Sequence, residues 1–152
     1  MKQLTLSIII NASVKTVWEN IVDLEKYKKW AIVFNKGSYF AGSWDQGSKI
    51  LFLAPNKNNK LDGTISEIYI NEKHKRIGIR HHGYIDDNIQ DTTSPEVLSW
   101  APSHEDYFFE ELDKKKTKFS IKLDTLEENY DEYTEIWPQA LELLKTNCEN
   151  KK

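Results

Sequence analysis

Cysteine, proline and glycine are all scarce in this sequence, which has one, four and six of them in 152 residues. The single thiol, Cys148, has no partner for a disulfide within the chain, which is typical of a reducing compartment. The glycines are scattered, so neither a phosphate-binding loop nor a dinucleotide-binding fingerprint is present. The sequence therefore predicts neither a disulfide scaffold nor a nucleotide site, and we expect no cofactor.

Long apolar runs and an excess of positive charge are also missing. No segment approaches the roughly 20 apolar residues of a membrane-spanning helix. Residues 1–13 have too short an apolar core for a signal peptide, and their alternation is typical of a strand. The net charge is −3 with both signs interspersed, which argues against a nucleic-acid partner. We expect a cytoplasmic protein with no membrane span.

Aromatic residues are abundant by contrast, with five Trp, seven Tyr and six Phe. Large closed cores and apolar ligand pockets are both rich in such residues, so composition leaves the two open. A chain of this length is typical of one domain that buries about two-thirds of its unfolded surface. We therefore expect a single domain over residues 1–152.

The predicted order of elements begins with a strand and two short helices. Residues 3–10 alternate between apolar and polar side chains, as a half-buried strand does. Ser13 and Asp23 are good N-caps for two short helices. Over residues 34–123 the period becomes two, and the short spacing between most strand-like segments requires antiparallel neighbours. The polar segment 86–95 is expected to be a mobile loop.

The last segment, over about residues 129–149, carries a wide apolar stripe at helical spacing. Pro138 lies inside it and cannot donate a backbone hydrogen bond, so the helix is either kinked there or begins afresh, and we expect a kink. Together these patterns predict an α+β fold. A strongly curved antiparallel sheet wraps around the long C-terminal helix, and two short helices follow the first strand.

Several stretches resemble the helix-grip superfamily, which includes birch-pollen-allergen-like proteins, polyketide cyclases and steroidogenic lipid-transfer domains. Its opening is similar to residues 8–18, Ile-Ile-Ile-Asn-Ala-Ser-Val-Lys-Thr-Val-Trp. The branch related to the activator of the heat-shock chaperone ATPase is similar at Tyr27 with Trp30 and at residues 42–47, 105–107, 137–141 and 144–145. The resemblance covers nearly the whole chain and implies a helix-grip fold, which commonly carries a cavity. It leaves the function open, because this fold hosts binding proteins, enzymes and cochaperones.

The histidines do not form a metal site by their spacing. His81 and His82 are adjacent on a predicted strand, so their side chains point to opposite faces. His104 and Asp106 can face the same way, but no third ligand follows at a telling distance. We therefore predict no metal site.

Two polar residues are predicted on the concave side of the sheet. His81 continues the apolar row of Ile77 and Ile79, and Glu105 shares one strand face with Tyr107. Such groups either bind an internal partner or orient a ligand. The similarity to cyclases implies that Glu105 could act as a general acid or base, but spacing identifies no second catalytic group, and we assign no catalytic residue.

Large apolar side chains are predicted to converge with these two polar groups between the sheet and the C-terminal helix. The candidate ligand-binding residues are Trp30, Phe52, Ile65, Ile77, Ile79, His81, Glu105, Tyr107, Phe109, Trp137 and Leu141. Periodicity fits a closed core as well as a cavity, and the resemblance favours a cavity. We predict non-enzymatic binding of a small hydrophobic molecule, such as a lipid or a polyketide-like compound. A protein-interaction module with a protein partner is the alternative, and a cyclase-like enzyme is the third.

Overall fold

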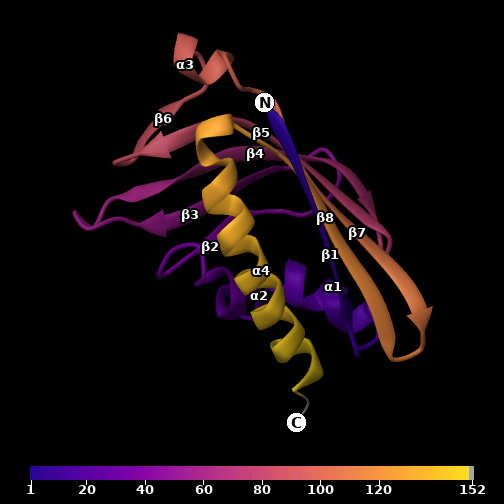
Figure 1. Ribbon diagram of the computed structural model, residues 1–152. Coiled ribbons are helices and arrows are strands. Elements are labelled where there is room, and N and C mark those ends of the chain that lie inside the picture. The colour runs from indigo at the N-terminus through magenta and orange to yellow at the C-terminus, as the bar shows by residue number, and fades with distance from the viewer. Residues whose placement is uncertain (151–152) are drawn as a thin grey trace.

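The computed structural model describes residues 1–150 of the chain (Figure 1). The elements in chain order are β1 (Lys2–Ile10), α1 (Val14–Val22), α2 (Leu24–Ala31), β2 (Tyr39–Gly42), β3 (Lys49–Pro55), β4 (Leu61–Glu72), β5 (Arg76–Asp86), β6 (Ile89–Asp91), α3 (Pro95–Leu98), β7 (Ser103–Asp113), β8 (Lys116–Thr125) and α4 (Glu127–Glu149). The predicted α+β architecture is confirmed, with two short helices directly after the first strand.

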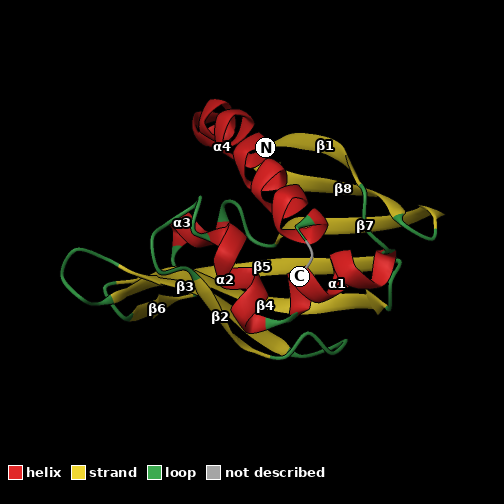
Figure 2. Cartoon of the chain, turned by 90° about the horizontal axis from the view of Figure 1, so that it is seen from below, coloured by secondary structure: helices red, strands yellow, loops and turns green. Residues whose placement is uncertain are grey.

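All strand pairs of the single sheet are antiparallel, in the order β1-β8-β7-β5-β4-β3-β2, and β6 pairs with β5 off this path. The first and last strands are neighbours in the sheet, because β1 pairs with β8 along its whole length. Figures 1 and 2 show α4 lying across one face of the curved sheet. Figure 1 shows α1 and α2 toward one end of the molecule and α3 at the other.

The two early helices begin at the predicted caps. The Ser13 hydroxyl accepts a hydrogen bond from the Thr16 backbone at 3.2 Å, and the Asp23 carboxylate accepts one from the Lys26 backbone at 3.1 Å. Both caps satisfy an amide that a helix N-terminus otherwise leaves unpaired. The two helices are tied together further along, where the Trp30 indole donates to a backbone carbonyl of α1 at 2.9 Å.

The long helix α4 begins at Glu127 and continues through Pro138 to Glu149 without beginning afresh. Its buried side chains extend from the middle of the helix to its C-terminal end and are Trp137, Ala140, Leu141, Leu144 and Cys148. They belong to the main hydrophobic core together with α1, α2 and the concave face of the sheet. In residues 1–150 no helix, α4 included, is apolar enough over sufficient length to cross a membrane.

The pairing of β4 with β5 contains two register shifts. At the first, Ile65 pairs with Gly83 and Ser66 pairs with His81, so that His82 is an extra residue on β5. A bulge of this kind reverses which residues point to which face beyond it. His81 and Tyr84, three positions apart, therefore both point toward the concave side, which regular alternation does not allow.

The predicted position of Ile65 on the concave side is wrong. Phe52 on β3 pairs with Thr64 on β4, so these two side chains point to the same side of the sheet. Ile65 is the next residue along and points to the opposite side, where it forms a separate small cluster with Leu53 and Ile85.

The segment 86–95 is more structured than the predicted mobile loop. It contains β6, which pairs with β5 across a two-residue turn, and Ser94, which caps α3. The turn residues Asp87 and Asn88 have φ values of 48° and 69°, the left-handed conformation of the tightest hairpins. Asp and Asn tolerate this conformation better than other non-glycine residues. An Asp-Asn pair, however, predicts a hairpin turn less strongly than an Asn-Gly pair does.

Candidate functional site

A cavity of about 630 Å³ lies between the sheet and the first half of α4. Residues of α2, α3, α4 and six strands form its wall, and the exposed residues Asn35, Pro55 and Glu96 lie where it opens to solvent. Pockets for small molecules typically have volumes of about 300–1,000 Å³. The cavity therefore has the size of a small-molecule site, whereas the second half of α4 rests on solid core.

Six of the eleven predicted ligand-binding residues line this cavity: Trp30, Phe52, His81, Glu105, Tyr107 and Trp137. Ile77, Ile79, Phe109 and Leu141 do not line it and are buried in the main core, where the ring of Phe109 lies 4.9 Å from that of Trp18. Ile65 lies on the opposite face. Residues on one face of a strand advance by about 6.8 Å for every second residue. Residues on the same face of a strand can therefore lie far apart, and the alternation pattern does not show which of them border the cavity and which lie in the core.

The inner part of the cavity is bounded by a nearly continuous band of aromatic rings. Going round it through Phe52, Tyr27, Trp30, Trp137 and Tyr107, successive ring centroids are 6.2, 5.1, 6.5 and 6.4 Å apart. Glu105 and His81 close the circuit between the last of these rings and the first, since His81 lies 6.2 Å from Phe52. We call these seven residues the ring wall.

Glu105 is the one carboxylate of the ring wall. Its Oε1 lies 3.0 Å from Nε2 of His81, and its Oε2 accepts a hydrogen bond from the Tyr107 hydroxyl. His81 is held from the other side, because its Nδ1 lies 2.6 Å from the Ser66 hydroxyl. The Glu105 side chain is 21 % exposed. It is thus fixed in orientation and still borders the cavity, with acceptor capacity to spare on both oxygens.

The chain Ser66–His81–Glu105 contains the residue types of a serine hydrolase. A nucleophile must reach its substrate, however, and Ser66 is only 1 % exposed and does not line the cavity. In this arrangement Ser66 orients the imidazole, and the groups offered to the cavity are the imidazole and the carboxylate. The geometry supports recognition of a ligand better than acyl transfer.

Three tyrosines near Glu105 have raised pKa values. Burial, and then the charge of Glu105, raises the pKa of Tyr107 well above its usual range, and the pKa of Tyr27 is raised for the same two reasons. The pKa of Tyr133 on α4 is raised by burial and by the charges of Glu105 and Glu132. All three phenols therefore remain protonated near neutral pH, and negative charge dominates this part of the cavity.

Other cavity residues escaped the sequence analysis. Tyr27 and Tyr133 belong to predicted apolar helix stripes, so their periodicity was a usable signal. Tyr84 and Trp100 stack with ring centroids 5.9 Å apart at the outer part of the cavity. Tyr84 reaches it only because of the bulge at His82, which no local pattern indicates.

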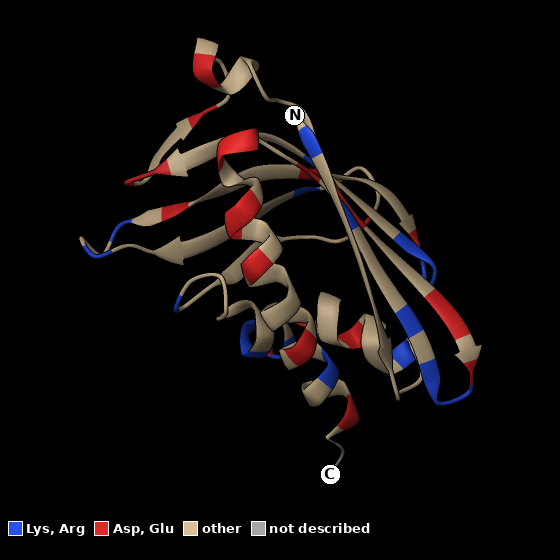
Figure 3. Ribbon diagram, viewed as in Figure 1, with Lys and Arg blue, Asp and Glu red and all other residues tan. Residues whose placement is uncertain are grey.

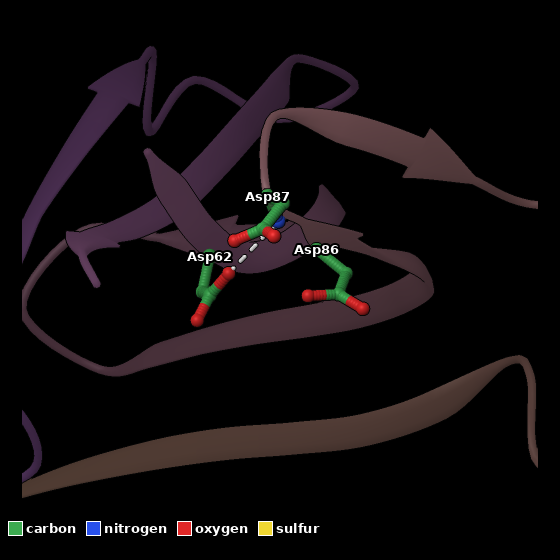
Figure 4. A group of neighbouring side chains, drawn as sticks. All are labelled: Asp62, Asp86 and Asp87. Carbon is green, nitrogen blue, oxygen red and sulfur yellow. Dashed lines mark hydrogen bonds between the residues drawn. The ribbon is translucent and has the colours of Figure 1, made fainter. Parts of the chain in front are cut away.

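A second group of acidic side chains lies at the end of the sheet. Asp62, Asp86 and Asp87 have carboxylate oxygens within 4.8 Å of one another (Figure 4). Asp62 Oδ1 already accepts hydrogen bonds from the Asp87 backbone at 3.0 Å and from Asn56 Nδ2 at 3.1 Å. Asn56 also donates to Asp87. These hydrogen bonds give the cluster a structural role, because they hold the β3–β4 turn against the β5–β6 turn.

Cys148 should be nearly inert in the folded protein. Burial, and then the charge of Glu149, raises the pKa of this thiol to about 12. Relative to its ordinary value of 9.0, the thiolate population at pH 8 falls about a thousandfold. We expect a colorimetric disulfide reagent to react with the denatured chain within the mixing time and with the native chain far more slowly. Equal rates in both states would show that the thiol is accessible.

The chain has a helix-grip-like fold with a cavity lined by aromatic side chains, so the resemblance seen in the sequence is confirmed at the level of the fold. No protein-family model matches the chain, and no curated protein is similar in sequence. Solved structures do match it. The Aha1 dimer from Colwellia psychrerythraea is 20% identical, with a TM-score of 0.70 over 100% of this chain and 99% of that one.

Two further structures extend the likeness. Protein MLL2253 from Mesorhizobium loti is 10% identical, with a TM-score of 0.73 and 99% of each chain covered. DynU16, from the dynemicin biosynthetic locus, is 11% identical, with a TM-score of 0.70 over 99% of this chain and 48% of that one. At these identities the likeness concerns the fold.

Proposed function

We propose that this protein binds a small hydrophobic molecule in the cavity under the first half of α4 and acts as a binding protein rather than an enzyme. The observation that carries the proposal is the cavity of about 630 Å³ walled by aromatic side chains. A chain under selection for stability alone gains by filling such a space, since interiors are otherwise close-packed. The membership of DynU16 in a biosynthetic locus also supports a small-molecule ligand.

Most of the affinity comes from apolar surface that the ligand removes from water, about 25 cal/mol for each Å². The aromatic rings of the ring wall provide that surface, and they lose little conformational freedom on binding because they already pack against one another. His81 and Glu105 orient the polar end of the ligand, because they are themselves held by Ser66 and Tyr107. Lipids and polyketide-like compounds are the classes to test first.

Thr64→Trp should abolish most of this binding. Thr64 lines the cavity beside Phe52, its cross-strand partner, so a large side chain there occupies the space of the ligand. We expect at least about tenfold weaker binding, the loss of roughly 1.4 kcal/mol. The measurement is a titration of a panel of lipids, flavonoid-like and polyketide-like compounds, followed through backbone amide NMR shifts.

The matched control is Thr5→Trp, at an exposed position of β1, which should bind like the unmodified protein. Amide spectra of both variants report whether the fold is retained. The proposal fails if no compound moves the amides around the cavity, or if Thr64→Trp binds as well as the control.

A protein partner is the second candidate function. Ile89 on β6 and Leu98 on α3 are 71 % and 62 % exposed, which is unusual for large apolar side chains. The similar Aha1 structure is that of a dimer, which supports a second copy as the partner. If the titrated compounds shift only amides of such an outer surface, this alternative is favoured over the binding of a small molecule in the cavity.

A further inference from the structure

The charged groups of the cavity wall are predominantly acidic. Four carboxylates line it, from Asp62, Glu96, Glu105 and Asp124, and no lysine or arginine within residues 1–150 does. The two lining histidines are each engaged by one of these acids: His81 lies 3.0 Å from Glu105, and His104 lies 3.3 Å from Asp124. Met1 also lines the cavity, so an anionic ligand would lose its hydration without meeting any lysine or arginine side chain, and the Met1 amino group is the one other cationic group among the lining residues.

The helix above the cavity adds to this negative field. Residues 127–135 of α4 contain five carboxylates and no lysine or arginine, and Figure 3 shows them in red on the half of the helix that lies over the cavity. Glu127 and Glu128 stabilise the helix N-terminus by opposing its dipole. Asp131, Glu132 and Glu135 lie beyond the first turn; like the first two they are exposed and do not line the cavity, so they act on it only through a long-range field that salt screens.

Two hydrogen-bond donors of the ring wall are already engaged within the protein. The Trp30 indole donates to the Asn20 carbonyl, and the Tyr107 hydroxyl donates to Glu105. The cavity is bordered by aromatic rings, whose faces carry negative electrostatic potential, and by a carboxylate with unused lone pairs. Aromatic faces surrounding one carboxylate form the chemistry that recognises organic cations.

We infer that the cavity prefers a cationic amphiphile, an apolar molecule that carries an amine or quaternary ammonium group. Its apolar body lies in the aromatic cavity, and its ammonium group lies at the ring wall beside Glu105. This inference rests on the proposed function, because it names the class of ligand for the same cavity.

Three probes that share one apolar body test the inference on the unmodified protein: 2-naphthylmethylammonium, 2-naphthylmethanol and 2-naphthoate. We expect the ammonium compound to bind about tenfold more tightly than the alcohol, the ratio that a partly desolvated cation–π site with a carboxylate supplies. The naphthoate should bind most weakly. Affinities come from titration calorimetry, and amide NMR shifts at His81 and Tyr107 locate the binding.

Glu105→Gln then isolates the charge, because it removes the charge while keeping the shape of the side chain. It should weaken the ammonium compound about tenfold and change the affinity of the alcohol by less than about twofold. Glu110→Gln, at an exposed position of the same strand, is the control and should leave both affinities unchanged. If Glu105→Gln does not fold, the comparison of the three probes on the unmodified protein still decides.

The possible outcomes separate this inference from the proposed function. Equal binding of ammonium compound and alcohol, or tightest binding of the naphthoate, overturns the cation preference and leaves a hydrophobic binding protein. An equal loss of both affinities in Glu105→Gln also overturns it, because a structural defect then explains the change. If none of the three probes moves amides of the ring wall, the inference fails, and the titration with lipids, flavonoid-like and polyketide-like compounds decides separately whether the proposed function fails too.

Discussion

Replacing Trp137 by alanine should lower the free energy of unfolding by about 3–5 kcal/mol, the usual loss for a buried aromatic side chain. Trp137 is 4 % exposed, and its ring lies 4.7 Å from Phe34, 6.5 Å from Trp30 and 6.4 Å from Tyr107 between centroids. It joins α4 to α2 and to the sheet at once. Because one side already borders the cavity, the loss should lie near the lower end of this range.

Denaturant titration followed by circular dichroism measures this change. Glu135→Ala, at an exposed position of the same helix, is the matched control and should change the free energy of unfolding by less than about 0.5 kcal/mol. A loss below about 1 kcal/mol for Trp137→Ala would mean that α4 does not close over the sheet through this side chain.

Replacing Asp106 by alanine should destabilise the protein by about 2–3 kcal/mol. Asp106 is buried on the sheet face opposite the cavity, where it accepts hydrogen bonds from the Tyr69 hydroxyl at 2.8 and 2.7 Å and from Arg76 at 3.2 Å. Its loss leaves both donors without an acceptor. The Arg76 side chain is 33 % exposed, so water compensates in part and the full cost of breaking a buried ion pair is not reached.

Glycine at position 78 makes this arrangement possible. A Cβ atom there would lie 2.6 Å from the Tyr69 ring, which crosses the strand to reach Asp106. Denaturant titration again measures the loss, with Glu111→Ala at an exposed position of β7 as the control. The double variant Asp106→Leu with Arg76→Met should recover part of the stability, because it leaves no unpaired charge. A loss below about 0.5 kcal/mol for Asp106→Ala would show that the three side chains are not coupled.

The local elements of the fold could be predicted because they depend on residues close together in the chain. The caps at Ser13 and Asp23 involve groups three residues apart. The strand at residues 3–10 and the apolar stripe of α4 appear as periods of two and of about 3.6 residues, which report directly on one buried face. The antiparallel pairing of strands that follow one another in the chain could be predicted from the short connections between them.

The candidate site could be predicted only in part. Alternation on β5 and β7 correctly placed His81 and Glu105 on the concave side, and their contact at 3.0 Å joins the two strands. The same alternation placed Ile77 and Ile79 on that side, where they fill solid core. Alternation could not distinguish them from cavity residues. It shows only which face of the strand a side chain is on, whereas a cavity depends on which other elements pack against that face.

By itself the sequence determined the class of fold, the caps and most of the residues that point inward, since hydrophobic period and backbone preference act over a few residues. Only the tertiary structure decided which end of the inward face is hollow. The bulge at His82 brought Tyr84 to the cavity, and the register of β3 with β4 sent Ile65 to the other face. Strand register and helix position depend on the packing of the whole chain, and they assembled Tyr27 and Trp30 with Glu105 into one wall.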